Sequence, residues 1–324
     1  MNFRLSARHV LAAAVGVGGV VLLVHHTGLA RVMETIRGSA TYFPWIFLLE
    51  GSILACTVAA LRSLYGDVRK KIPVGAYIRA GLVGYAVMGL VPAGRAIAEA
   101  TRAALLSKHV TAGRAAVAAA RLQAVSLLAN SAISAVGSIA VFSVAGRSLA
   151  LWLILGNMTL TGGLGMVLLL AGRHSGVGSW LGRKLPRLER GGSEFDTHFA
   201  SGDLIPGRAL AFEFLGRILQ VLQNSVLVLA VGGVFGVTPA LCSESLHLVG
   251  AAAGDLIPAQ LGATEAAFQH LASTLGLQPA QALSIALLAH LAQVAWISVG
   301  VLMPILQPGA DARSHVTSPN APLP

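Results

Sequence analysis

Long apolar runs constrain this sequence more than any other feature. They occur at about 10–26, 44–61, 74–92, 115–145, 149–171, 209–235, 246–258 and 279–306. A helix needs about 20 apolar residues to cross the hydrocarbon core of a bilayer, and most of these runs reach that length. Only 11% of the residues are charged and the mean hydropathy is +0.73, which is too little polarity to cover a soluble surface. The sequence therefore predicts an all-α integral membrane protein and excludes a soluble enzyme.

The polar segments are short. The only long polar loop, at 173–208, is too small for a separate domain. We expect a single membrane domain over residues 1–306, followed by a disordered cytoplasmic tail over 307–324. The sequence contains no GxSxG, HExxH or P-loop motif, and its two cysteines and its histidines show no zinc-ligand spacing. We therefore expect no enzymatic activity, no cofactor and no metal site.

The sequence contains an internal repeat. Leu-Val-Gly at 82–84 recurs at 248–250, and Pro92 and Glu99 recur as Pro258 and Glu265, all at one offset of 166 residues. Residues 82–107 match 248–273 at 11 of 26 positions. The same offset relates the run that starts at 44 to the one at 209, and the run at 115 to the one at about 281. Each half, about 1–146 and 147–306, therefore consists of two spans, a broken segment and a third span.

The broken segments lie where Pro92 and Pro258 interrupt apolar runs, because proline removes a backbone donor and clashes with the preceding turn. Predicted helical stretches with scattered polar residues follow at 95–109 and 260–275. Interrupted segments at matching positions of two halves point to a transport site. Each one is either a re-entrant hairpin, which returns to the side it entered from, or a kinked full span followed by an ordinary loop.

Charge placement favours the re-entrant hairpins. The formal net charge is +10, from 23 Lys and Arg against 13 Asp and Glu. With two re-entrant hairpins and a cytoplasmic N-terminus, 20 of the 23 basic residues are cytoplasmic, and the exceptions are Arg31, Arg37 and Arg147. This distribution obeys the positive-inside rule, whereas a full crossing by the first broken segment would move the basic 173–208 loop outside.

The predicted architecture is therefore about six full spans plus two re-entrant helical hairpins, arranged as two inverted repeats. Both termini would be cytoplasmic, in a bacterial-type plasma (inner) membrane. The positive charge is explained by orientation, and no basic patch is interleaved with aromatic residues, so we expect no nucleic-acid partner.

Charged side chains inside a bilayer are costly and mark functional sites. Together with the two turns, they give these candidate substrate-binding or transport residues: Glu99, Arg102, Arg95, Glu265, Asp255, Pro92, Pro258 and Gly262. Glu99 and Arg102 can pair at i, i+3, and Arg95 and Arg102 could hold a lipid phosphate. Glu265 has no basic neighbour at helical spacing, and an unpaired buried carboxylate tends to stay protonated. Glu265 and Asp255 are therefore either proton carriers or residues of a wet cavity.

Five further residues are secondary candidates: Glu50, Glu213, Arg217, Asn130 and His290. Glu213 and Arg217 stand at i, i+4, which favours a structural ion pair at the membrane edge. For Asn130 and His290, as for several glutamines in these runs, hydrogen bonds between helices are the favoured interpretation.

At these motifs the chain resembles the lysylphosphatidylglycerol synthase transmembrane region, also called the flippase-like membrane domain family. The motifs are Pro92-Ala-Gly-Arg-Ala-Ile-Ala-Glu99-Ala-Thr-Arg102 and Pro258-Ala-Gln-Leu-Gly262-Ala-Thr-Glu265-Ala, and the resemblance covers essentially the whole chain. The chain differs at Ala98, where the family tends to have Gly, and at Thr264, where Arg is frequent.

The resemblance implies movement of a polar or anionic (glyco)phospholipid, an aminoacyl-lipid or a polyprenyl lipid between leaflets, with membrane lipids as partners. The soluble aminoacyl-transferase domain of the bifunctional members has no counterpart in this sequence. The alternative is a membrane-embedded subunit or scaffold of a lipid or glycan biosynthetic enzyme, with a lipid-modifying enzyme as its partner.

Overall fold

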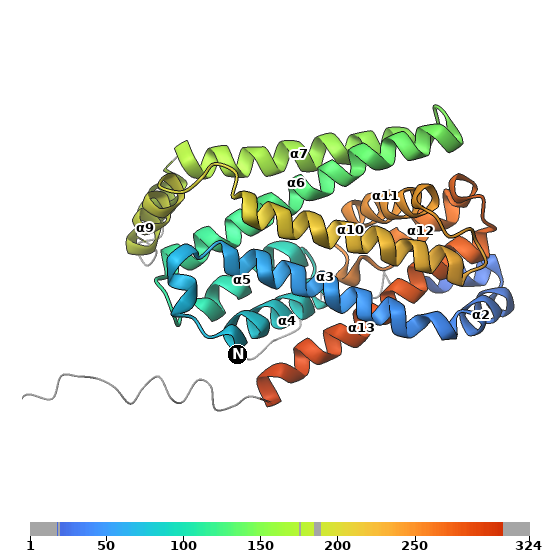
Figure 1. The fold of residues 1–324 in the computed structure, drawn as a ribbon, viewed down its shortest axis with the longest axis horizontal. Coiled ribbons are helices and arrows are strands. Elements are labelled where there is room, and N and C mark those ends of the chain that lie inside the picture. Colours follow the sequence, from blue (N-terminus) through green and yellow to red (C-terminus); the bar gives the residue numbers. More distant parts are fainter. Residues whose placement is uncertain (1–17, 19, 175, 185–188, 307–324) are drawn as a thin grey trace, which may run out of the picture.

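The computed structural model describes residues 18, 20–174, 176–184 and 189–306, which form helices and contain no strand (Figure 1). Within these residues, five helices are long and apolar enough to cross a membrane. They are α3 (Phe43–Ser63), α6 (Ala112–Ala145), α7 (Leu149–His174), α10 (Gly207–Ala230) and α13 (Pro279–Leu306). Each coincides with a predicted span, so the all-α membrane class is confirmed. The predicted span at 10–26 lies largely outside the described residues, as does the tail after 306.

Two pairs of shorter helices occupy the positions of the predicted broken segments. The first pair is α4 (Val74–Leu90) and α5 (Gly94–Leu106), which pack against each other. The second is α11 (Val237–Ala253) and α12 (Ala263–His270), joined through η4 (Pro258–Gln260) and followed by η5 (Ala272–Leu275). In Figure 1 the α4–α5 pair lies toward the end of the molecule near α9, and the α11–α12 pair lies toward the opposite end.

The two turns share an unusual backbone conformation. Val91 and Ile257, which precede the prolines, are extended (φ −119°, ψ 137° and φ −104°, ψ 132°), as a residue before proline prefers. Ala93 and Ala259, which follow the prolines, are left-handed (φ 53° and 51°), a region that non-glycine residues seldom adopt. The sequence repeat at offset 166 is therefore also a repeat in backbone conformation at both chain reversals.

The glycines of the repeated Leu-Val-Gly motif allow the returning helices to approach closely. A Cβ on Gly84 would lie 2.6 Å from Arg102 Nε of α5. A Cβ on Gly250 would lie 2.7 Å from the backbone Cα of Thr264 in α12. A larger residue at either position would push the second helix of its pair outward.

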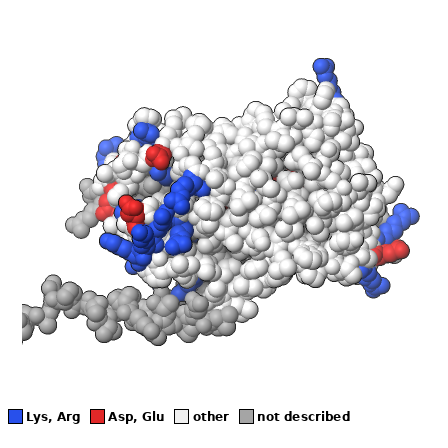
Figure 2. Space-filling model, in the orientation of Figure 1, with Lys and Arg blue, Asp and Glu red and all other residues white. Residues whose placement is uncertain are grey.

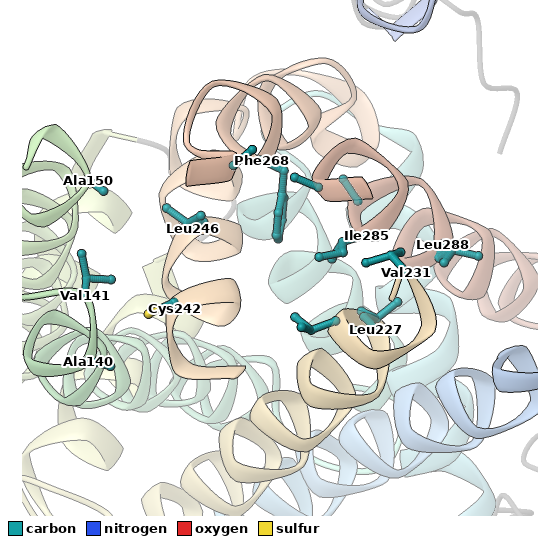
Figure 3. Close-up of a cluster of buried hydrophobic side chains, with 14 of the residues drawn as sticks. Ala140, Val141, Ala150, Leu227, Val231, Cys242, Leu246, Phe268, Ile285 and Leu288 are labelled. Atoms are coloured by element: carbon teal, nitrogen blue, oxygen red, sulfur yellow. The ribbon is translucent and has the colours of Figure 1, made fainter. Parts of the chain in front are cut away.

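The long helices surround these pairs. In Figure 1, α3 runs opposite to α10, against which it packs, and α6 runs opposite to α13. An apolar cluster fills the space between α6, α10, α11, α12 and α13 (Figure 3). Phe268 of α12, Leu227 of α10 and Ile285 of α13 are each at most 1% exposed within it. Packing of α12 and α13 against the rest of the bundle therefore depends on this cluster.

Charged side chains gather at the two ends of the molecule, and the broad band between them is almost uncharged on the face shown in Figure 2. One end carries the amphipathic helix α2 (Leu29–Gly38), followed by η1 (Ala40–Tyr42). The other carries η2 (Gly66–Lys70), α8 (Val177–Lys184) and α9 (Glu189–Ala200). The segment 173–208, predicted as a polar loop, is therefore largely helical.

The α8–α9 pair is held by polar contacts at this end. Asp196 accepts hydrogen bonds from the N–H groups of Gly178 (2.8 Å) and Ser179 (2.7 Å) and from the Ser179 hydroxyl. Burial raises the pKa of the Asp196 carboxyl, but these hydrogen bonds outweigh it and hold the pKa below its ordinary value. Arg121 of α6 donates to the Phe199 carbonyl (2.8 Å) and lies over its ring, which docks α9 on α6.

The tight first turn predicts a strong effect of Gly94→Ala. A Cβ there would lie 2.1 Å from the Met88 carbonyl oxygen, so the turn must open, at a cost of about 1–3 kcal/mol. The matched control is Gly163→Ala in α7, where a Cβ meets nothing within 4 Å and the helix gains about 0.5–1 kcal/mol. SDS-induced unfolding of the purified variants measures both changes, and wild-type behaviour of Gly94→Ala would contradict this description of the turn.

Candidate functional site

A polar cavity of about 130 Å³ lies where the turns of the two short-helix pairs meet the long helices. Six predicted candidate residues line it: Glu50, Arg95, Glu99, Arg102, Glu213 and Arg217. Eight further residues of the lining are polar or titratable: Thr57, Tyr85, Gln123, Ser126, Gln220, His247, Gln260 and Gln293. The rest of the lining is apolar: Ile53, Leu54, Met88 and Leu122. Residues remote in the sequence thus converge on a single charged space inside an apolar bundle.

The α5 wall of the cavity carries an ion pair. Arg102, 5% exposed, donates to Glu99 Oε1 one turn earlier in the helix, as predicted from their spacing. The other oxygen, Glu99 Oε2, is buried without a hydrogen-bond partner among the described residues. An unsatisfied acceptor facing a polar cavity can receive a hydrogen bond from a bound group, because leaving it unpaired is costly.

Glu50 on α3 has a different environment. It accepts hydrogen bonds from the Tyr85 hydroxyl of α4 and from Gln223 Nε2 of α10 (2.8 Å). Gln223 also donates to the Ile46 carbonyl (3.1 Å), which fixes α10 against α3. Both oxygens of Glu50 are engaged, so this carboxyl ties three helices together at the edge of the cavity.

The predicted pairing of Glu213 with Arg217 is not what the structure shows. Arg217 donates to Gln220 and lies 3.7 Å from Glu244 Oε1 of α11. Glu244 is fully buried and also accepts from Asn224 Nδ2 (2.9 Å). The correction has a physical reason, since α11 places a carboxylate against Arg217 that a comparison within α10 cannot detect. Glu213 Oε1 is buried without a partner in the described part of the chain.

The sequence reasoning missed two residues of α11: His247, which lines the cavity, and Glu244, which lies against Arg217 behind it. The apolar run was placed at 246–258, whereas α11 begins at Val237. A wider window over 237–253 would have revealed a glutamate inside an apolar helix, which is the signal for an intramembrane charge.

The tips of the two pairs are joined by an ion pair. Arg95 Nε at the start of α5 lies 3.1 Å from Asp255 Oδ1, just after α11. The side chains are 25% and 42% exposed, so this link is accessible to water or to a headgroup. Asp255 therefore has a basic partner, supplied by the other half of the chain.

Glu265 also has a basic partner that helical spacing did not reveal. It is fully buried, accepts from the Gly262 N–H (2.8 Å) at the start of α12, and lies 3.1 Å from His290 Nδ1. His290 Nε2 is 2.9 Å from the Ala259 carbonyl, which can only accept, so Nε2 carries a hydrogen. Through these contacts His290 and Glu265 fix the Pro258–Gly262 turn against α13.

Asn130 is not among the residues that line the cavity. It is buried in α6, and its Oδ1 has no hydrogen-bond partner in the residues that the structure describes. Pro92, Pro258 and Gly262 belong to the turns and are not among the residues that line the cavity. Among the described residues, no group of three or more His, Cys, Asp or Glu could hold a metal ion.

The sequence model of the lysylphosphatidylglycerol synthase TM region matches residues 9–300. The chain belongs to this family. The match covers both short-helix pairs and every charged residue of the cavity, so the family's membrane region includes the whole site. Comparisons with curated proteins and with solved structures find no match.

A double-mutant cycle tests the contact between Glu265 and His290. Glu265→Ala and His290→Ala each remove one side of a buried, charge-assisted contact. The summed losses in unfolding free energy should therefore exceed the loss in the double variant by about 1.5–3 kcal/mol. SDS titration of the four proteins gives these values. Strict additivity would show that the two side chains do not interact in the folded protein.

Proposed function

We propose that this protein moves a polar or anionic lipid between membrane leaflets, with the headgroup in the polar cavity and the acyl chains in the surrounding lipid. The observation that carries this proposal is the convergence of six charged side chains on one cavity within an apolar bundle. Buried charge inside a membrane is costly and persists where it serves a substrate path. Membership of a lipid-related membrane family supports the same function.

In this proposal the α4–α5 and α11–α12 pairs are re-entrant hairpins that enter from opposite sides, and the two halves of the chain are inverted repeats. The left-handed backbone that Ala93 and Ala259 share supports the repeat. The opposite directions of α3 and α10, and of α6 and α13, support the inversion. The positive-inside rule makes the end that carries α8 and α9 cytoplasmic, in a bacterial-type plasma membrane.

The cavity offers groups for each part of a lipid headgroup. Arg95 and Arg102 carry guanidinium groups, which bind phosphate oxygens by paired hydrogen bonds. The unpaired Glu99 Oε2 accepts from a headgroup amine or hydroxyl. The Arg95–Asp255 link would open as a headgroup passes between the tips and close behind it, which is a form of alternating access. No covalent chemistry is required, so the proposed activity is transport.

Transport can be measured in liposomes that contain a fluorescent analogue of phosphatidylglycerol, by following its bleaching with dithionite. We expect the wild-type protein to expose inner-leaflet lipid faster than protein-free liposomes do. Glu99→Gln and Arg95→Gln should slow this exchange at least about ten-fold, because each removes a charged contact of about 1.5–3 kcal/mol.

The matched controls make the same chemical changes on the exposed helix α2, as Glu34→Gln and Arg37→Gln, and should exchange lipid at the wild-type rate. Wild-type rates in both cavity variants would contradict the site. No exchange by the wild-type protein, together with a changed lipid mass, would favour the enzyme-subunit alternative.

Cysteine labelling tests the proposed topology. Lys108→Cys, after α5, and Gln278→Cys, before α13, place exposed thiols at opposite ends of the molecule, whereas the native Cys56 and Cys242 are buried. An impermeant maleimide applied to intact cells should label Gln278→Cys, and Lys108→Cys should label only after lysis. Labelling of both thiols from one side would overturn the inverted arrangement.

A further inference from the structure

A second hollow, distinct in chemistry from the polar cavity, runs along the surface of α3. Its volume is about 600 Å³, and its lining comes from α3, η2, α4, the start of α10 and Trp296 of α13. Gly51, Ala55 and Ala59 line it at four-residue spacing, so they lie on one face of α3 and leave a furrow there. We call this hollow the α3 groove.

The α3 groove is closed at one end and basic at the other. At the closed end Trp296 stacks on Phe47 (ring centroids 5.0 Å apart) and donates to the Phe47 carbonyl (3.0 Å). At the other end, three arginines from three segments line the groove: Arg62 of α3, Arg69 of η2 and Arg208 of α10. None of the three has an ion pair or side-chain hydrogen bond within the described chain.

Two further groups occur near the arginines. Tyr77 lines the groove and has a buried hydroxyl with no hydrogen-bond partner in the described residues. Asp67 is the acidic residue of η2, but it does not line the groove. The basic end therefore offers three guanidinium groups with no carboxylate partner among the described residues, and such a group of arginines suits a phosphate.

The length of the α3 groove matches one lipid leaflet. From Gly51, which contacts the Trp296 ring, to Arg62 is eleven residues of helix, or about 16 Å at 1.5 Å per residue. Half of the roughly 30 Å hydrocarbon core is about 15 Å. A single acyl chain that starts at the level of the arginines would therefore end near the Trp296–Phe47 stack.

We infer that the α3 groove binds one anionic phospholipid of the leaflet on the arginine side. Its phosphate contacts Arg62, Arg69 and Arg208, and one acyl chain lies along Gly51, Ala55 and Ala59. Binding at this site does not require transport. Leu54 lines both the α3 groove and the polar cavity, so it is the partition between them. If the proposed function holds, the lipid bound here is the one positioned to deliver its headgroup past Leu54.

Trp296 provides a direct probe. In a variant that retains Trp296 as its sole tryptophan, with Trp45, Trp152 and Trp180 changed to Phe, lipids with brominated acyl chains quench the fluorescence when a chain reaches the groove. We expect brominated phosphatidylglycerol to quench at a several-fold lower mole fraction than brominated phosphatidylcholine of the same chains. Inorganic phosphate should not displace the quenching lipid, because it lacks the chain that fills the groove.

Two sets of variants separate the headgroup from the chain. The triple change Arg62→Gln, Arg69→Gln and Arg208→Gln should abolish the preference for phosphatidylglycerol. The matched triple Arg173→Gln, Arg183→Gln and Lys184→Gln alters exposed basic residues at the same end and should preserve it. Ala59→Phe fills the furrow while leaving the arginines intact, and should reduce quenching by both lipids.

Equal quenching by the two lipids in the protein with intact arginines would overturn the inference, as would an unchanged preference in the arginine triple variant. The liposome assay is independent of these outcomes. A protein that selects phosphatidylglycerol at Trp296 but does not exchange lipid would retain the α3 groove site and lose the proposed function.

Discussion

Backbone hydrogen bonding in a medium without water is the constraint on which this structure depends. Lipid offers no partner for a free N–H or carbonyl group, so a chain that reverses within an apolar body must find partners in the protein. The second turn shows how this is met. The Ala259 carbonyl contacts His290 Nε2, and the Gly262 N–H donates to Glu265, which itself lies against His290. Thus α13 supplies a side chain to a turn that precedes it in the sequence.

The same constraint explains why the short-helix pairs lie inside a ring of longer helices. α6 packs against α5 and α11, and α13 packs against α4 and α12, so each pair is covered by a long helix from both halves. Repeated glycines at 84 and 250 let the second helix of each pair approach closely enough for this enclosure. The cavity remains where the tips meet, because charged side chains occupy that space in place of apolar ones.

Local features of the sequence predicted local structure well. The prolines and the 166-residue offset identified both turns, because proline interrupts a helix and restricts the residue before it to extended conformations. The left-handed conformation of Ala93 and Ala259 was not predicted, because an isolated alanine disfavours it. The apolar runs located the long helices for the same reason. The helices in 173–208 were not predicted because they contain few apolar side chains. Those that they have, such as Phe195 and Phe199, are buried by packing against α6, which the sequence does not show.

Partners across the fold could not be predicted from spacing. Arg217 has Glu213 one turn away, yet it approaches Glu244, and Glu265 finds His290 on another helix. Helical spacing ranks only neighbours in the same helix, whereas burial favours whichever opposite charge the packing brings close. The sequence likewise could not predict that the six charged residues converge on one cavity, because this depends on how the two halves of the chain pack together. The charged residues themselves could be identified from the sequence, but their arrangement around one cavity could not.

The two halves share a backbone conformation at their turns but differ in the contacts of their charged side chains. This difference affects how the site could work. Glu99 Oε2 lies beside the cavity with no partner among the described residues, whereas its repeat partner Glu265 accepts from the start of α12 with Oε2 and has His290 Nδ1 3.1 Å from Oε1. The three basic and acidic side chains of α5 line the cavity, and α12 contributes none. The second turn is therefore fixed by His290, whereas the first is open to a ligand, and the accessible Arg95–Asp255 ion pair links their tips. In such a pair, a headgroup that draws Arg95 away from Asp255 would release the α5 side while the Glu265–His290 contact holds the α12 side in place.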